Sequence, residues 1–214
     1  MVVLSQNKIH LITQQLEQLI CCTAGNPSRI DDFYVFSYPA LLAGAERHVT
    51  PGDWSVNEVT RRLTMVYGWM PCSPKSHNEA AIAELAALLN AQRDLATIIP
   101  VAARCFANSL VAGSKFMHCE RPHEAPMFDS NLEALFWPET RSRLSYPSTA
   151  VRRYLEWTVA IHAVRPDLKA KARRWALEAF GYEVSEVRAV EAIAFYAASG
   201  STRPGASHFP GSVA

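Results

Sequence analysis

The chain has 214 residues, of which 49% are hydrophobic and 19% charged, and its formal net charge is +1. This composition is that of an ordinary globular protein and excludes disordered, collagen-like and repetitive fibrous chains. A chain of this length buries a sizeable core without disulfide or metal cross-links. We therefore expect neither a cofactor nor a structural metal.

The first half of the chain carries several start signals for helices. Ser5 precedes apolar residues spaced three and four apart over positions 9–20, which is typical of one buried helix face. Residues 33–36 (Phe-Tyr-Val-Phe) favour a strand or a buried loop. Capping boxes at Ser55 to Glu58 and at Ser76 to Glu79 predict two more helix starts.

The middle of the chain contains two predicted helix boundaries and one weakly patterned segment. Pro100 predicts the start of a helix that ends near Gly113, and another helix is expected after Ser114. A capping box at residues 130–133 predicts a short helix. Residues 117–146 are rich in proline, so we expect the seam between two helical lobes near residues 115–146.

The last third of the chain also has helical signals. Ser148 precedes one amphipathic pattern, and Pro166 predicts the start of another helix that Gly181 ends. Because helical patterns dominate, the sequence predicts an all-α, multi-helix globular protein over residues 1–198, with two helical lobes around a central cleft. The tail 199–214, rich in Gly, Ser and Pro, is expected to be flexible.

Cysteine usage and hydropathy bear on the compartment. The five cysteines include one adjacent pair and no Cys-x-x-Cys spacing, which is neither a disulfide framework nor a zinc ribbon. The N-terminal segment lacks the apolar run of a signal peptide, and no stretch has the ~18 consecutive apolar residues of a membrane span. We expect a cytoplasmic protein with reduced thiols and no membrane contact.

Positive charge is concentrated in one segment of the chain. Residues 141–174 contain nine basic and two acidic residues, a net charge of +7. Such a segment suits the phosphates of nucleic acid or an acidic protein partner, although a solvated helix face would have the same composition. The candidate nucleic-acid contacts here are Arg141, Arg143, Arg152, Arg153, Lys169, Arg173 and Arg174.

Common catalytic motifs do not occur in this sequence. It has no glycine-rich phosphate loop, no G-x-S-x-G elbow and no H-E-x-x-H helix. The residues closest to a metal cluster are those around His118, Cys119 and Glu120. Adjacent residues on a helix point in different directions, so we expect no metal site there.

The most informative segment runs from Asn108 to Asp129. It contains Gly113-Ser114-Lys115 in succession, then the apolar Phe128 and Asp129 before a predicted helix. This segment resembles the catalytic segment of helix-hairpin-helix DNA glycosylases, especially the oxoguanine-excising branch. The resemblance implies that Gly113 and Ser114 form the hairpin exit on DNA, that Lys115 is the nucleophile, and that Asp129 is the carboxylate beside it.

Such chemistry makes demands that the residues themselves must meet. A lysine amine attacks only when neutral, which requires an apolar pocket or nearby positive charge, and a carboxylate must handle the proton. Apolar residues that surround Lys115 in the sequence are candidates for that pocket. The target base must also be extruded from the duplex.

Three functional hypotheses follow from these observations. The first is a divergent DNA glycosylase or lyase, and the second is a non-catalytic helical protein that binds nucleic acid through its arginines. The third is a helical interaction protein of an assembly or defence system, whose basic face binds an acidic protein. In the latter two, Lys115 is an ordinary solvated lysine and Asp129 is simply a helix N-cap.

Overall fold

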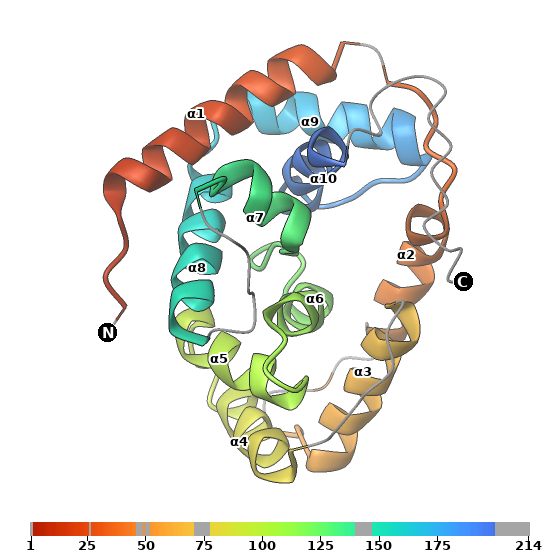
Figure 1. Cartoon of the computed structure of the whole chain (residues 1–214). Coiled ribbons are helices and arrows are strands. Elements are labelled where there is room, and N and C mark those ends of the chain that lie inside the picture. Colours follow the sequence, from red (N-terminus) through yellow and green to blue (C-terminus); the bar gives the residue numbers. More distant parts are fainter. Residues whose placement is uncertain are drawn as a thin grey trace, which may run out of the picture.

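The computed structural model describes residues 2–25, 27–45, 49, 52–70, 78–139 and 147–199. These residues form ten helices and no strands, so the predicted all-α fold is confirmed (Figure 1). Residues 200–214 of the predicted tail lie outside the described residues, as do Arg141 and Arg143.

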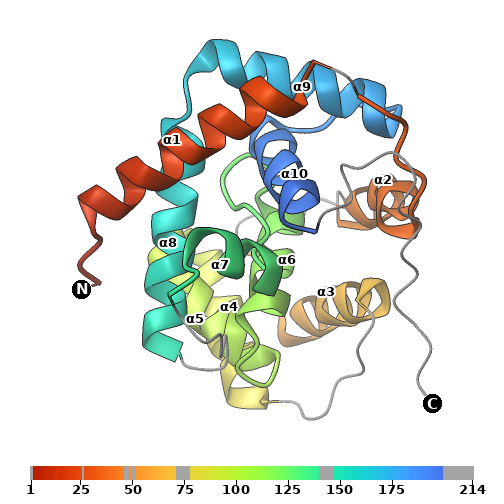
Figure 2. The same ribbon diagram turned by 45° about the horizontal axis from the view of Figure 1, so that its top comes forward.

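The helices, in chain order, are α1 (Gln6–Thr23), α2 (Phe33–Ala45), α3 (Val56–Trp69), α4 (Glu79–Asn90), α5 (Leu95–Cys105), α6 (Leu110–Glu120), α7 (Ser130–Phe136), α8 (Pro147–Ala163), α9 (Pro166–Phe180) and α10 (Glu186–Ala198). Helices α3 to α6 pack against one another, and α1, α8, α9 and α10 form a second group. Helices α1, α9 and α10 lie toward one end of the molecule and α3, α4 and α5 toward the other, while α8 runs along one side and reaches α5 (Figures 1 and 2). The loop 121–129 leads from α6 to α7, which packs on α10.

Buried apolar side chains from both groups form one contiguous core. No helix among the residues that the structure describes is long and apolar enough to cross a bilayer. The cysteines at positions 21, 22, 105 and 119 are free thiols, as predicted, and Cys72 lies outside the described residues.

Several predicted helix ends are confirmed. The Ser5 hydroxyl accepts a hydrogen bond from the Lys8 amide, and the Ser55 hydroxyl accepts one from the Glu58 amide. Helix α9 begins at Pro166 and ends at Phe180, and the following Gly181 caps it with a left-handed φ of 85°. Glycine adopts this conformation without the steric cost that a Cβ adds.

Three predicted starts are displaced by one or two residues. Helix α4 is capped by Asn78, whose side chain accepts from the Ala81 amide, and α7 is capped by Asp129 rather than Ser130. Helix α8 begins at Pro147, just before Ser148. In α4 and α7 the cap is an Asn or Asp within two residues of the predicted serine, and these residues cap helices as well as Ser does.

The predicted strand or loop at residues 33–36 is wrong, because these residues begin helix α2. The Asp32 carboxylate accepts from the Val35 amide at 2.8 Å and so caps the helix start. Pro39 inside α2 has no N–H to donate to the carbonyl of Val35. The Tyr182 hydroxyl donates to that carbonyl at 2.6 Å instead, so a distant residue compensates for the proline.

The predicted helix from Pro100 to Gly113 is also wrong. Helix α5 starts earlier, capped by Asp94, and ends at Cys105. The turn to α6 uses positive φ angles at Ala107 and Asn108. Gly113 lies inside α6, where a Cβ would be 2.8 Å from the backbone nitrogen of Ala103. Gly113 therefore permits close packing of α5 on α6 and is not a turn residue.

Candidate functional site

Helix α6 and the start of α7 bring the two predicted catalytic residues into one region. Lys115 is the sixth residue of α6, and Asp129 is the N-cap of α7; both side chains are partly buried. Burial raises the pKa of the Asp129 carboxyl above its ordinary value, and the Lys115 ammonium opposes this shift. The two groups are therefore within electrostatic reach of each other.

The Lys115 side chain lies against two aromatic rings. Its ammonium nitrogen is 5.2 Å from the centre of the Trp69 ring and 5.8 Å from that of Tyr34. These rings meet edge to face at 5.3 Å, and the Trp69 indole N–H donates to the Ser37 hydroxyl at 2.9 Å. The apolar surroundings of Lys115 thus include rings from α2 and α3, which the sequence did not indicate.

Ser114 connects α6 to the residue before Asp129. Its side chain is fully buried, and its hydroxyl accepts a hydrogen bond from the Phe128 amide at 3.0 Å. The same oxygen is 3.2 Å from the Phe128 carbonyl oxygen and 2.9 Å from that of Val111. The burial of Gly113 and Ser114 speaks against the predicted nucleic-acid contacts and gives Ser114 a positioning role.

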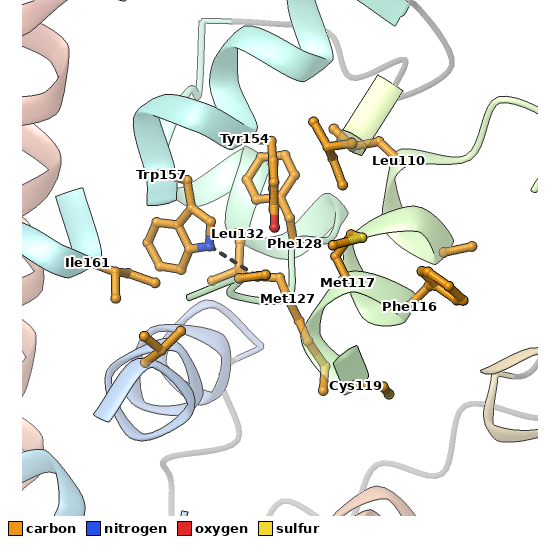
Figure 3. Close-up of a cluster of buried hydrophobic side chains, with 14 of the residues drawn as sticks. Leu110, Phe116, Met117, Cys119, Met127, Phe128, Leu132, Tyr154, Trp157 and Ile161 are labelled. Atoms are coloured by element: carbon orange, nitrogen blue, oxygen red, sulfur yellow. Dashed lines mark hydrogen bonds between the residues drawn. The ribbon is translucent and has the colours of Figure 1, made fainter. Parts of the chain in front are cut away.

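The backbone that leads into Asp129 is also held from α8. The Trp157 indole N–H donates to the Met127 carbonyl at 3.0 Å (Figure 3). Phe128 inserts its ring between Trp137 and Tyr154, with edge contacts at 5.8 and 6.2 Å. Asp129 therefore begins α7 from a backbone segment that is fixed by the core.

His118 holds the same loop from α6. Its Nδ1 lies 2.7 Å from the Ala125 carbonyl oxygen and its Nε2 lies 2.6 Å from the Tyr38 hydroxyl. A carbonyl only accepts, so Nδ1 carries the proton and Nε2 accepts from Tyr38. Burial lowers the pKa of His118 to about 3, and the Arg188 charge adds to this effect. His118 is therefore a neutral structural residue with both nitrogens engaged.

The earlier part of the loop has two further anchors. The Ser185 hydroxyl donates to the Pro122 carbonyl at 2.6 Å, and His162 Nε2 lies 2.9 Å from the Glu124 carbonyl oxygen. Side chains from α6, α8 and the start of α10 thus hold one loop. This loop places Asp129 relative to Lys115.

A buried ion pair beside the site was missed by sequence reasoning. Arg188 donates to Glu191 at 2.6 Å within α10, and the guanidinium also lies 5.1 Å from the centre of the Tyr38 ring. Burial raises the pKa of Glu191, Arg188 opposes the shift, and the charges of Asp129 and Lys115 also act on it. The sequence does contain a signal for this pair, because two opposite charges lie three residues apart in a mostly apolar helix.

The predicted basic surface is less continuous than the sequence implies. Arg153 pairs with the fully buried Glu133 and is only 12% exposed, so the prediction that it contacts nucleic acid does not fit. Lys169 donates to the His162 carbonyl, while Arg173 lies 3.7 Å from Glu183. Arg152 and Arg174 are exposed. Helix α8, which carries Arg152 and Arg153, lies on the opposite side of α6 from α2 and α3 in both views (Figures 1 and 2).

A sizeable cavity among the described residues lies apart from this site. It measures about 710 Å³ and is lined by Trp54, Arg62, Glu120 and residues near them. Arg62 donates to the Glu120 carboxylate at 2.6 Å and lies over the Trp54 ring. The charged groups in the wall of this cavity are therefore already paired with each other. Neither Lys115 nor Asp129 lines it.

Comparisons with other proteins provide no assignment: no family model, no curated protein and no solved structure matches the chain.

Proposed function

We propose that this chain is a nucleic-acid-binding protein of the DNA glycosylase or lyase class, with Lys115 as nucleophile and Asp129 as proton acceptor. The observation that supports the proposal is that the Lys115 ammonium opposes the rise in the pKa of the Asp129 carboxyl, so the two groups lie within electrostatic range of each other. The hydrogen bond from the Phe128 amide to the Ser114 hydroxyl fixes the backbone beside both residues. The cytoplasm is the compartment we propose, since the cysteines described are free thiols.

The environment of Asp129 favours the chemistry. Burial raises the pKa of the Asp129 carboxyl, and a carboxylate with a raised pKa is a stronger base than an exposed one. The aromatic rings of Tyr34 and Trp69 lie against the Lys115 side chain and hold its amine in this region. Asp129 uses only Oδ1 to cap α7, accepting from the amides of Asn131 and Leu132 at 2.9 Å. Its Oδ2 is the oxygen we assign to the proton.

In the proposed step, Lys115 displaces the base from the sugar. The lone pair of Lys115 Nζ forms a bond to the sugar C1′ carbon, while the bond between C1′ and the base breaks. The departing base takes the bonding electrons and then a proton from solvent, and Asp129 takes the proton that Nζ loses. At an abasic site, Nζ condenses with the C1′ aldehyde and water is released.

Borohydride trapping on an abasic duplex tests the proposal, because reduction converts the imine into a stable amine cross-link. We expect the wild-type chain to become covalently attached and Lys115→Gln to lose the cross-link. The matched control is Lys8→Gln, because the Lys8 ammonium also lies over an aromatic ring, 5.4 Å from the centre of Trp137. Equal trapping by both variants would sink the assignment of Lys115.

Binding at varied salt separates the other hypotheses. A protein that neutralises phosphates loses affinity steeply as salt rises, because counterions are released on binding. Salt-dependent duplex binding without trapping would leave a non-catalytic nucleic-acid-binding protein. If the chain neither binds the duplex nor becomes trapped on it, the result favours an acidic protein partner.

A further inference from the structure

Helix α10 buries a charged pair where apolar side chains would be expected. Arg188 and Glu191 are only 6% and 2% exposed, and the residues next to them in the chain are all valine or alanine. Two opposite charges lose their hydration when they are buried, and a well-packed apolar pair is often as stable or more stable. Stability alone therefore does not account for this pair.

The ion pair engages only part of each side chain. Arg188 Nη1 donates to Glu191 Oε1 at 2.6 Å. Arg188 Nε and Glu191 Oε2 are also buried, and neither atom has a hydrogen-bond partner among the described residues. Buried polar atoms are nearly always hydrogen-bonded, and an exception indicates a site where the charge itself has a function. The pair is therefore a candidate part of the proposed site.

Four charged groups are linked by electrostatic interactions in this region, and we call them the charge quartet. The Lys115 ammonium and the Asp129 carboxylate both act on Glu191. Arg188 acts on Glu191 and also on Asp129. The quartet comes from α6, from the cap of α7 and from α10, and α7 packs directly on α10. It contains two positive and two negative charges, so the loss of any one of them changes the balance.

Contacts with α2 and α6 hold the Arg188 end of the quartet in place. The guanidinium carbon of Arg188 lies 5.1 Å from the centre of the Tyr38 ring. The Tyr38 hydroxyl donates to His118 Nε2 at 2.6 Å, and His118 holds the loop that leads to Asp129. The contacts that place Asp129 therefore also place Arg188 and, through the ion pair, Glu191.

We infer that Glu191 is a positioning residue for the proposed reaction: its buried negative charge, held by Arg188, controls how readily the Lys115 amine gives its proton to Asp129. This inference rests on the proposed function and adds a residue that acts through its neighbours. A negative charge near an amine favours the ammonium form, and a like charge near a carboxylate makes that carboxylate a stronger base. Glu191 thus keeps Lys115 protonated in the resting chain and strengthens Asp129 as the proton acceptor.

Other ionisable groups beside the quartet stay neutral near neutral pH. Cys119 of α6 lies within range of Lys115, and burial raises the pKa of its thiol to about 12. Three tyrosines from α2, α8 and α10 interact with Glu191, and burial raises the pKa of each phenol above its ordinary value: Tyr38, Tyr154 and Tyr196. A changed pH response of Lys115 therefore reports on the quartet.

The test measures the rate of borohydride trapping on an abasic duplex as a function of pH. Glu191→Gln removes a negative charge near Lys115, so the pH at which trapping reaches half its maximum should fall by about one unit. The double variant Arg188→Gln/Glu191→Gln keeps the net charge of the wild type and should restore the wild-type midpoint. A merely structural role predicts slower trapping with an unchanged midpoint in both variants.

Carbon-13 NMR gives a second readout that does not depend on trapping. Reductive methylation with labelled formaldehyde marks the lysine amines, and the signal that is lost in Lys115→Gln assigns Lys115. This amine should titrate about one pH unit lower in Glu191→Gln than in the wild type. The matched control is Glu84→Gln, which removes a half-exposed carboxylate from a surface pair with Arg104 and should leave both midpoints unchanged.

A reciprocal measurement applies if Glu191→Gln does not fold. Two groups that interact change each other's titration, so Lys115→Gln should raise the pH at which the Glu191 carboxyl titrates. Carboxyl carbon-13 shifts follow this titration in the full chain. An unchanged Glu191 titration would overturn the inference.

The outcomes separate this inference from the proposed function. Trapping with the same midpoint in the wild type and in a folded Glu191→Gln variant would overturn the inference and leave the enzyme supported. A shifted Lys115 titration in a chain that is never trapped on abasic DNA would overturn the enzyme and leave only the charge coupling between Glu191 and Lys115.

Discussion

Ser114 and Phe128 are joined through a single hydroxyl group, and each is followed in the chain by a proposed catalytic residue. The Ser114 hydroxyl accepts from the Phe128 amide at 3.0 Å, and its oxygen lies 3.2 Å from the Phe128 carbonyl. Lys115 follows the serine and Asp129 follows the phenylalanine. This contact sets the register between the amine and the carboxylate.

Ser114→Ala removes the acceptor for the buried Phe128 amide. An unsatisfied buried N–H costs about 1–3 kcal/mol, so we expect the free energy of unfolding in urea to fall by that amount. Trapping on abasic DNA should slow as well, since Asp129 loses its register with Lys115. Ser130→Ala, an exposed change at the start of α7, is the control and should alter stability by less than about 0.5 kcal/mol. A Ser114 variant as stable as this control would contradict the positioning role.

Gly113→Ala should destabilise the protein although alanine is the better helix former. Its Cβ would meet the Ala103 backbone at 2.8 Å, and forced overpacking of this kind costs typically about 1–3 kcal/mol. Gly68→Ala in α3 is the matched control, because nothing lies within 4 Å of its Cβ position. We expect Gly68→Ala to leave the melting temperature unchanged or to raise it slightly. Equal behaviour of the two variants would show that α5 and α6 move apart without cost.

Local signals were sufficient to predict helices but not the turn in the middle of the chain. Ser5, Ser55, Pro166 and Gly181 act through neighbours a few residues away, so their effects can be predicted from sequence. Gly113 favours a turn by its local sequence, but it is needed for a contact with another helix, α5, which no local pattern reveals. The local sequence around a glycine is the same whether the glycine forms a turn or allows two helices to approach closely.

The candidate site was predicted only in part for the same reason. A short motif indicates Lys115 and Asp129, and in the structure the two groups lie within electrostatic range of each other. The rings beside Lys115 come from residues 34 and 69, and Tyr38 meets His118 across 80 positions. Such partners are set by tertiary packing, so a single sequence carries no pattern that pairs them.

His118 makes stability depend on pH in a defined direction. Its pKa is about 3 in the folded chain against an ordinary value of 6.5, so below pH 6.5 the unfolded chain binds a proton that the folded chain does not. Stability from this residue should therefore be constant above pH 6.5 and fall by about 1.4 kcal/mol per pH unit below it. Urea unfolding of wild type and His118→Gln measures the difference in slope between about pH 7 and about pH 5, a range that brackets the ordinary pKa of histidine. The control His10→Gln, exposed on α1, should keep the wild-type slope.

Arg152 and Arg153 are adjacent in sequence but should respond differently to removal. Arg153 is 12% exposed and pairs with buried Glu133, whereas Arg152 is 50% exposed and lies 3.9 Å from Glu156. Breaking a buried ion pair costs about 3–5 kcal/mol. Arg152 is half exposed and its contact with the buried Glu156 is long, and Glu156 keeps the Ser5 amide as a donor at 3.0 Å, so the loss of Arg152 should cost less than about 1 kcal/mol. We expect Arg153→Ala to be strongly destabilised in urea and Arg152→Ala to unfold like wild type. Similar unfolding of the two variants would place Arg153 on the surface and restore it as a candidate nucleic-acid contact.

Asp129→Asn separates the two roles that the structure gives this side chain. Asparagine caps helices as well as aspartate does, so its oxygen should still accept from the Asn131 and Leu132 amides, and stability should change by less than about 1 kcal/mol. The amide accepts no proton from Lys115, and loss of a general base typically slows a reaction by about 10²–10⁴-fold.

Asp94→Asn provides the matched control, because Asp94 caps α5 in the same way through the Thr97 amide. Rates of borohydride trapping on abasic duplex, measured beside unfolding curves for both variants, give the comparison. A slow Asp129→Asn with a normal Asp94→Asn and intact folds would support proton transfer at Asp129. Wild-type trapping rates in both variants would show that Asp129 only caps α7.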